Sequence, residues 1–413
     1  MRGFLVPRND KIEHKFEIDT RTKVNLAKQT IKNLKQYKTL KQKINLVVIA
    51  FLVSLNLFSQ NTYVFLGSYN KDKEAESIQV YQLDTLKGKL TKVTSAKNVI
   101  NPSYLTVSPN GKYVYACTET KTPNDGNVSS FEFNPENKTL IFLNKQGSGG
   151  ENPVYISVHK SGKWLVNANY TEGSVSVHPL LENGKIDSLS QNFQYTDSSV
   201  HKERQTRSHV HSAVFSPLND YLFLPDLGAD KIRCYRFDET LKQPLVETKN
   251  PFTKTDLEAG PRHFTFHPNQ KFGYCIEEMA GAISVYQYEN GTLKKIQRIN
   301  THPENSTEGF ESSDIHISPD GRFLYATNRG KENNIAIFSI DGNGILKNIG
   351  YQSTLGKHPR TFALDQSGKF LVTSNVITGN VVVFKRNEKT GLLKKAGKEV
   401  KMENVSCVQV KRI

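Results

Sequence analysis

The stretch GPRHFTFHPNQKFGYCIEE, residues 260–278, has the pattern of a β-hairpin with charged residues at both ends. Apolar residues alternate with others on both sides of the turn residues 267–271, which is the period of two expected of strands. The start of the first strand and the end of the second strand then lie at the same edge of the sheet. We therefore expect Arg262 to approach Glu278.

The same hairpin pattern occurs six times along the chain. The equivalent turn residues, spaced by 51, 57, 51, 51 and 47 positions, are Gly111, Gly162, Asn219, Gln270, Gly321 and Gly368. Each hairpin is followed by a β-rich segment, such as residues 334–341 or 380–385, so one repeat supplies about four short strands. A period near 50 residues with four strands is typical of the blades of a β-propeller.

The two ends of the chain supply a seventh copy. Residues 404–410 (NVSCVQV) resemble the first strand of a repeat, and residues 62–69 (TYVFLGSY) resemble the second. We therefore predict an all-β fold, a seven-bladed β-propeller whose ring is closed by pairing of the N- and C-terminal strands. An open sandwich would not need matched half-repeats at opposite ends of the chain.

Residues 1–60 differ in kind from the propeller domain that we assign to residues 61–413. Residues 1–43 carry 12 Lys and Arg against 4 Asp and Glu, a net charge of +8 out of +15 for the whole chain. The apolar run that follows, residues 44–58, has about the length of a signal-peptide core and is short for a membrane span. We expect export, to the periplasm, with cleavage near Ser59 and Gln60.

Two other interpretations of this leader stay open. Residues 44–58 could remain uncleaved as a membrane anchor, or the true start could lie downstream of Met1 and the protein could be cytoplasmic. The charge that remains after residue 43 is scattered and does not form a basic stripe with aromatic residues. Nucleic acid is therefore not an expected partner. The oligomeric state is not indicated by the sequence.

The four cysteines, at positions 117, 234, 275 and 407, are spread over different repeats. They form no CxxC pair and no His/Cys spacing typical of zinc sites. We expect no disulfide framework, no metal and no cofactor, and we expect the thiols to be small buried apolar groups.

Three repeats resemble blades of the seven-bladed lactonase family, which contains propeller-type 6-phosphogluconolactonases and carboxymuconate lactonizing enzymes. The repeats are HVHSAVFSPLNDYLFLPDLGADKIRCYRFD (209–238), GPRHFTFHPNQKFGYCIEEMAGAISVYQYE (260–289) and SSDIHISPDGRFLYATNRGKENNIAIFSID (312–341). The resemblance covers about residues 62–413. It implies an enzyme that acts on a small-molecule lactone, with 6-phosphogluconolactone as the substrate typical of the family.

Strand starts and the ends of second strands converge at one mouth of a propeller channel. The ionisable residues expected there are His209, His211, Arg262, His263, Asp314, His316, His358, Arg360, Asp226, Glu278 and Arg329. In the muconate-lactonizing branch, the active-site histidine, two arginines and glutamate fall on His211, Arg262, Arg329 and Glu278. The stretches GPRHF and PDLGAD look closer to the phosphogluconolactonase branch, which favours hydrolysis over cycloisomerisation.

Lactone opening requires an activated water, a polarised carbonyl and a proton for the leaving alkoxide. We assign His211 and Glu278 to proton transfer. Arg262 and Arg329 are assigned to binding the oxyanion or an anionic group of the substrate. The remaining substrate-binding candidates are His209, His263 and Arg360.

Five other ionisable residues are expected to be structural. His316 and His358 are assigned to packing, and Asp226 is expected to anchor a turn. Glu277 lies one residue out of the period-two face of Glu278 and is expected to point away from it. His267 lies at the opposite, turn end of its blade.

Two alternative functions remain after the lactonase. One is an exported, non-catalytic propeller that binds a sugar acid or a protein partner, because propellers are common binding scaffolds. The other is a cycloisomerase of the muconate type. Since a phosphorylated sugar lactone is normally a cytoplasmic metabolite, an exported enzyme would meet an unphosphorylated aldonolactone instead.

The leader generates a first prediction. N-terminal sequencing of the protein purified from its native host should find a start near residue 60, because the basic flank and the apolar run 44–58 together direct export and cleavage. Recovery of the intact chain from the cytoplasmic fraction would contradict this expectation.

Overall fold

The computed structural model describes residues 19–55, 61–120, 125–306 and 309–413, with the backbone alone for residues 45–55 and 125. The chain divides into two units, Met1–Gln60 and Asn61–Ile413. In the first unit, helix α1 (Thr20–Leu55) has exposed side chains from residue 20 to residue 44.

The expected cleavage site at Ser59 and Gln60 lies outside the described residues. In the described part of the chain, no helix combines the length and the hydropathy that a membrane crossing requires.

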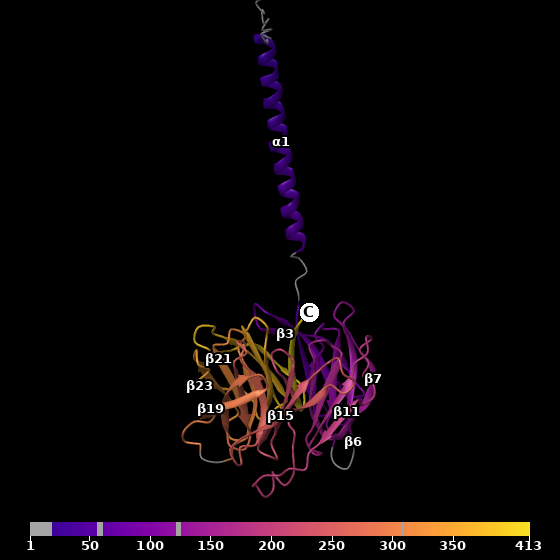
Figure 1. Cartoon of the computed structure of the whole chain (residues 1–413), viewed down its shortest axis with the longest axis vertical. Helices are drawn as coiled ribbons and strands as arrows, with labels where there is room; N and C mark the ends of the chain where they lie inside the picture. The colour runs from indigo at the N-terminus through magenta and orange to yellow at the C-terminus, as the bar shows by residue number, and fades with distance from the viewer. Residues whose placement is uncertain (1–18, 56–60, 121–124, 307–308) are drawn as a thin grey trace, which may run out of the picture. The chain divides into compact units, whose positions relative to one another are not determined.

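The second unit consists of seven antiparallel sheets of four strands each (Figure 1). The inner strands are β28 (Val405–Arg412), β4 (Pro102–Val107), β8 (Pro153–Val158), β12 (Val214–Phe215), β16 (Pro261–Phe266), β20 (Ser312–Ile317) and β24 (Pro359–Leu364). The second strands are β1 (Thr62–Ser68), β5 (Tyr113–Thr118), β9 (Trp164–Asn169), β13 (Tyr221–Asp226), β17 (Phe272–Glu277), β21 (Phe323–Asn328) and β25 (Phe370–Asn375).

The outer half of each sheet completes the blade. The third strands are β2 (Ile78–Asp84), β6 (Asp125–Asn134), β10 (Ser174–Pro179), β14 (Lys231–Phe237), β18 (Ala282–Glu289), β22 (Asn334–Ile340) and β26 (Asn380–Arg386). The outer strands are β3 (Lys89–Ala96), β7 (Thr139–Glu151), β11 (Gln191–Gln194), β15 (Leu245–Lys254), β19 (Thr292–Asn300), β23 (Leu346–Ser353) and β27 (Leu393–Lys401).

The ring closes as the sequence predicts. Strand β28 pairs with β1 in antiparallel register, with Val64 opposite Val410 and Leu66 opposite Val408. The same strand packs against the inner strands β24 and β4 of the two neighbouring blades. In Figure 1 the yellow C-terminal strand accordingly lies beside the indigo N-terminal strands. The seven-bladed propeller closed by its two ends is thus confirmed.

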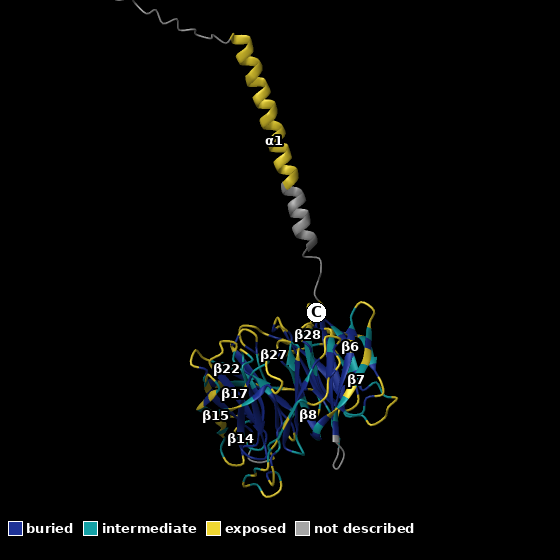
Figure 2. Cartoon of the chain, turned by 45° about the vertical axis from the view of Figure 1, so that its right-hand side comes forward, coloured by how far each residue is buried: buried dark blue, intermediate teal, exposed yellow. Residues whose placement is uncertain are grey.

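The core lies between neighbouring blades. Second strands such as β1 and β9 are buried along their whole length, because they have a strand on each side and a blade against each face. Figure 2 shows this burial as dark blue strands with exposed turns. All four cysteines are buried free thiols, and they come from four different blades.

Irregular pairing at the ends of the inner strands shapes the channel mouth. In six blades the register between the inner and the second strand shifts within the first few residues of the inner strand. Such a shift leaves an extra residue on one strand and re-aims its side chain. Arg262 and Arg360 both occupy positions of this kind, Arg262 between Pro261 and His263 and Arg360 between Pro359 and Phe362.

Ring closure generates the second prediction. Deletion of residues 404–413 removes the inner strand of one blade and exposes an apolar edge, so the melting temperature should fall by more than about 10 °C. Deletion of residues 1–58 removes no propeller strand and serves as the control. Equal melting temperatures of the C-terminally truncated and full-length proteins would contradict this closure.

Candidate active site

Arg262 and Glu278 lie in contact at the edge of the hairpin formed by residues 260–278. Pro261 pairs with Glu277 and His263 pairs with Ile276, so Arg262 lies in the bulge and Glu278 directly follows β17. Arg262 Nε donates a hydrogen bond of 2.9 Å to Glu278 Oε2. The expected approach of these two residues is confirmed.

Glu278 is shared by three arginines. Arg329, from the end of β21, places Nη2 2.9 Å from Oε2, and Arg204, from the loop between β11 and β12, donates a 2.6 Å bond to Oε1. Burial alone would raise the pKa of Glu278, but Arg329, Arg262 and Arg204 together hold it well below its usual range. The carboxylate is therefore ionised at neutral pH, and each of its oxygens is engaged by at least one guanidinium.

Arg262 is enclosed on all sides. Its side chain is 1% exposed, and Nη1 donates to the carbonyl oxygen of Ser313 at 2.7 Å and lies 3.1 Å from His263 Nε2. Burial, with the charges of Arg329 and Arg360, lowers the pKa of Arg262 to about 9. A buried cation is stable only when it is paired and hydrogen-bonded, so Glu278 is required to hold it there.

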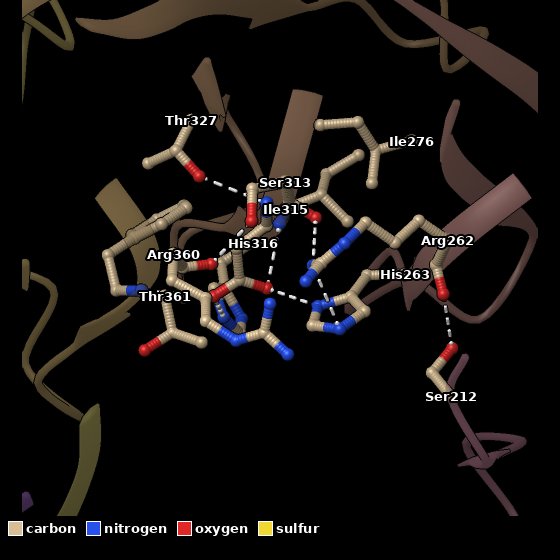
Figure 3. Close-up of polar contacts among 12 residues, drawn as sticks. Ser212, Arg262, His263, Ile276, Ser313, Ile315, His316, Thr327, Arg360 and Thr361 are labelled. Carbon is tan, nitrogen blue, oxygen red and sulfur yellow. Dashed lines mark hydrogen bonds and ion pairs between the residues drawn. The ribbon is translucent and has the colours of Figure 1, made fainter. Parts of the chain in front are cut away.

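A second buried network lies beside Arg262. His263 Nδ1 is 2.7 Å from Asp314 Oδ1, and His316 Nε2 is 3.1 Å from Asp314 Oδ2. The backbone N–H of Phe362 also donates to Asp314 Oδ2, at 3.0 Å, so this carboxylate connects three consecutive blades. Figure 3 shows Arg262 and His263 on one side of the group, with His316 and Arg360 on the other.

His263 of this network is neutral at physiological pH. Burial and the charge of Arg262 lower the pKa of His263 to about 4, although Asp314 opposes the shift. In the neutral ring the geometry favours a proton on Nδ1, donated to Asp314, and a lone pair on Nε2 that faces Arg262. His263 is therefore positioned to orient the Arg262 guanidinium.

His211 differs from His263 because one of its ring nitrogens has no partner. Its ring is 5% exposed and lies 5.4 Å from the His263 ring and 5.3 Å from the Tyr170 ring. Nδ1 is buried and makes no hydrogen bond to any described residue. Burial, followed by the charge of Arg262, lowers the pKa of His211 well below its usual value. An unprotonated imidazole thus lies next to the arginine cluster.

The chain matches the family model described as lactonase, 7-bladed beta-propeller, over residues 63–410. It is 40% identical to the 6-phosphogluconolactonase of Formosa agariphila, with 84% of this chain and 99% of the relative covered. This chain belongs to the seven-bladed β-propeller lactonase family. The Bacillus subtilis 6-phosphogluconolactonase is 33% identical, over 84% of this lactonase and 97% of the relative.

Two solved structures share the fold of this chain. The periplasmic gluconolactonase of Pseudomonas aeruginosa superimposes with a TM-score of 0.80 at 32% identity, covering 85% of this lactonase and 99% of that chain. A crystal structure described as a putative 6-phosphogluconolactonase from Bacteroides fragilis gives the same TM-score of 0.80 at 34% identity, covering 86% of this lactonase and 99% of that chain.

The remaining substrate-binding candidates of the lactonase lie around this cluster. His209 stacks on Tyr170 with ring centroids 4.4 Å apart, and its Nδ1 is 2.8 Å from the Tyr170 carbonyl oxygen. Arg360 lies over the Tyr69 ring at 5.3 Å and places Nη2 3.7 Å from Glu119 Oε2. His209 is therefore fixed by packing, whereas Arg360 connects the arginine cluster to the other side of the mouth.

Three residues expected to be structural make structural contacts. Asp226 accepts hydrogen bonds from the backbone of His209 and from Arg233, as expected of a turn anchor. Glu277 is bonded to Ser284 and Arg298, away from Glu278. His267 faces Gly321 at the turn end of its blade.

The two structural histidines at the mouth differ. His316 takes part in the Asp314 network, and that carboxylate outweighs burial and raises the pKa of His316. His358 lines a cavity of about 410 Å³ beside Lys357, and burial, with Arg329 and Arg360, lowers its pKa to about 4. Among the described residues, no group of three or more His, Cys, Asp or Glu side chains could hold a metal ion.

Sequence reasoning missed Arg204 and Glu119. Arg204 lies in an insertion, and the 57-residue spacing between Gly162 and Asn219, against 51 in neighbouring repeats, was the signal for that insertion. Glu119 occupies the same position in its repeat as Glu278 does. Comparison of the last residue of each hairpin could therefore have found it.

The neutral histidines generate the third prediction. A histidine with a folded pKa near 4 and an unfolded pKa of about 6.5 is neutral in the fold, while the unfolded chain binds a proton. The contribution of this histidine to the free energy of unfolding is therefore fully present above pH 6.5, and it is lost as the pH falls from 6.5 towards 4. The melting temperature should decrease from pH 7 to pH 5, and His263→Asn, which keeps a donor for Asp314, should decrease less over that interval. The control is His267→Asn, and an unchanged pH dependence in His263→Asn would contradict the prediction.

Proposed function

We propose that this lactonase hydrolyses the ring ester of a sugar-acid lactone of the 6-phosphogluconolactone type. The observation that supports it most directly is the unprotonated, buried His211 beside guanidinium groups preorganised by one carboxylate. The names of the relatives, 6-phosphogluconolactonase and gluconolactonase, support the same substrate class. The substrate would be the lactone of a hexonic acid, with or without a phosphate group.

In the proposed reaction, His211 transfers the protons, and two arginines stabilise the negative charge that develops. His211 takes a proton from a water molecule as the water oxygen bonds to the carbonyl carbon of the lactone. Arg262 and Arg329 stabilise the oxyanion that forms. The carbonyl re-forms as the ring C–O bond breaks, and protonated His211 returns the proton to the leaving alkoxide. The product is an open-chain hydroxy acid.

The sequence predicted that Glu278 transfers protons, but its surroundings favour a role in positioning the arginines. A carboxylate whose oxygens are all engaged by arginines, with a pKa well below its usual range, is a poor proton acceptor. We assign it to holding Arg204, Arg262 and Arg329 in place. Arg204, which is the most exposed of the three, is assigned to an anionic group of the substrate.

We also propose that the protein works outside the cytoplasm. The basic flank and apolar run of residues 1–58 support export. The periplasmic location stated for the gluconolactonase of Pseudomonas aeruginosa is consistent with it. In that compartment an unphosphorylated aldonolactone is the more accessible substrate.

The fourth prediction tests the roles of the side chains. His211→Ala should lower kcat for lactone opening by about 10²-fold or more, because it removes the general base. Arg204→Ala should raise KM more for 6-phosphogluconolactone than for gluconolactone, because it removes the guanidinium assigned to an anionic group of the substrate. Both rates must be corrected for spontaneous hydrolysis.

Matched controls lie away from the mouth. His267→Ala changes a histidine at the turn end of a blade, and Arg236→Ala changes an exposed arginine on the third strand β14. Both should keep wild-type kinetics. If His211→Ala and Arg204→Ala also kept wild-type kinetics on every lactone that the parent opens, the mouth would not be the active site, and the binding-scaffold function would be favoured.

A further inference from the structure

A second polar cavity opens at the same end of the propeller, between the blades that begin with β28, β4 and β8. It has a volume of about 660 Å³, and residues that line it include Tyr69, Asn101, Glu119, Asn152, Thr171 and Asn404. None of these residues was assigned a function from the sequence. The cavity lies next to the arginine cluster, because Glu119 is the ion-pair partner of Arg360.

Two buried oxygen atoms of this cavity have no hydrogen-bond partner among the described residues. They are Glu119 Oε2 and Asn152 Oδ1. Arg360 Nη2 is 3.7 Å from Glu119 Oε2, which is an ion-pair distance but is too long for a hydrogen bond. Buried acceptors without donors are rare in folded proteins, because leaving the hydrogen bond unmade is costly.

Backbone conformation explains why asparagines occur in this cavity, but it does not explain why two buried side-chain oxygens lack hydrogen-bond donors. Asn101, Asn152 and Asn404 all have positive φ, and asparagine tolerates that backbone conformation. Asn101 also donates to the carbonyl oxygen of Glu119 at 3.1 Å. The backbone therefore accounts for the residue type at position 152, and nothing in the described chain accounts for its unused side-chain oxygen.

Comparison of Glu119 with Glu278 indicates which chemical groups a ligand of the cavity would carry. Glu119 and Glu278 hold the same position in their repeats, yet arginines engage both oxygens of Glu278, while Glu119 Oε2 accepts no hydrogen bond. One side of the mouth thus offers guanidinium donors, and the other offers two oxygen acceptors in a cavity that Lys71 also lines. A ligand that satisfies both sides carries an anionic or carbonyl group at one end and hydroxyl donors at the other.

We propose that this cavity is the subsite for the hydroxyl groups of the substrate, and that Glu119 and Asn152 accept hydrogen bonds from a polyhydroxylated chain whose carboxyl end lies at the arginines. The inference rests on the proposed function, since it specifies which lactones the site prefers. The ligand class is a hexonic acid or its lactone, and a simple aliphatic lactone lacks the donors that the cavity needs.

Calorimetric binding of two carboxylates tests the subsite without relying on turnover. Sodium gluconate carries the hydroxyl groups, and sodium hexanoate has the same number of carbons with none. Wild-type protein should bind gluconate more tightly. Glu119→Gln should weaken gluconate binding at least about 10-fold and leave hexanoate binding within about 2-fold, because a lost hydrogen bond to a charged group has that magnitude.

Two further variants separate this role from a structural one. Asn152→Gly keeps the positive φ, leaves the Glu119 and Arg360 pair intact and should also weaken gluconate alone. Glu172→Gln is the control, because Glu172 follows the lining residue Thr171 but its carboxylate accepts from Gln194 of the outer strand. It should bind both ligands as the wild type does.

The outcomes distinguish this inference from the proposed activity. Equal weakening of both ligands, unchanged gluconate binding in Glu119→Gln, or a wild type with no preference for gluconate overturns the subsite. If the wild type opens no lactone but shows the expected binding pattern, the hydrolytic function fails and the subsite stands. If lactones are opened and the pattern is absent, the subsite alone fails.

Discussion

The carboxylate of Glu278 is the interaction on which the channel mouth depends. Three guanidinium groups, from two blades and one inserted loop, converge on it, and Arg262 among them is almost completely buried. Removing one partner of a buried ion pair typically costs about 3–5 kcal/mol, because an uncompensated charge is left behind. The arginines can remain close together only because this carboxylate neutralises part of their repulsion.

The rest of the mouth is arranged around that charge cluster. Burial and the charge of Arg262 lower the pKa values of His211 and His263, and Asp314 fixes His263 between blades. A histidine that would titrate near neutral pH in water is thereby kept in its neutral form. Arg329, Arg262 and Arg204 also hold the pKa of Glu278 well below its usual range, so this carboxylate is a poor proton acceptor.

Much of the fold followed from repeats in the sequence. The turn residues Gly111 to Gly368 indicated the blades, and the half-repeats at residues 62–69 and 404–410 indicated how the ring closes. Strand alternation also placed Arg262 next to Glu278, because both belong to one hairpin. Arg204 was not found in this way, since an inserted loop has no period and its reach depends on where the loop folds.

The sequence by itself determined the propeller, its closure and the residues that gather at one mouth, because those properties depend on local strand patterns and on a repeated hairpin. Only the tertiary structure decided which charges meet. Glu119 and Glu278 occupy equivalent repeat positions, but three arginines from separate segments surround Glu278, whereas Arg360 alone pairs with Glu119, at 3.7 Å. Protonation and hydrogen bonding depend on neighbours brought together by the ring, and a repeat pattern contains no information about them.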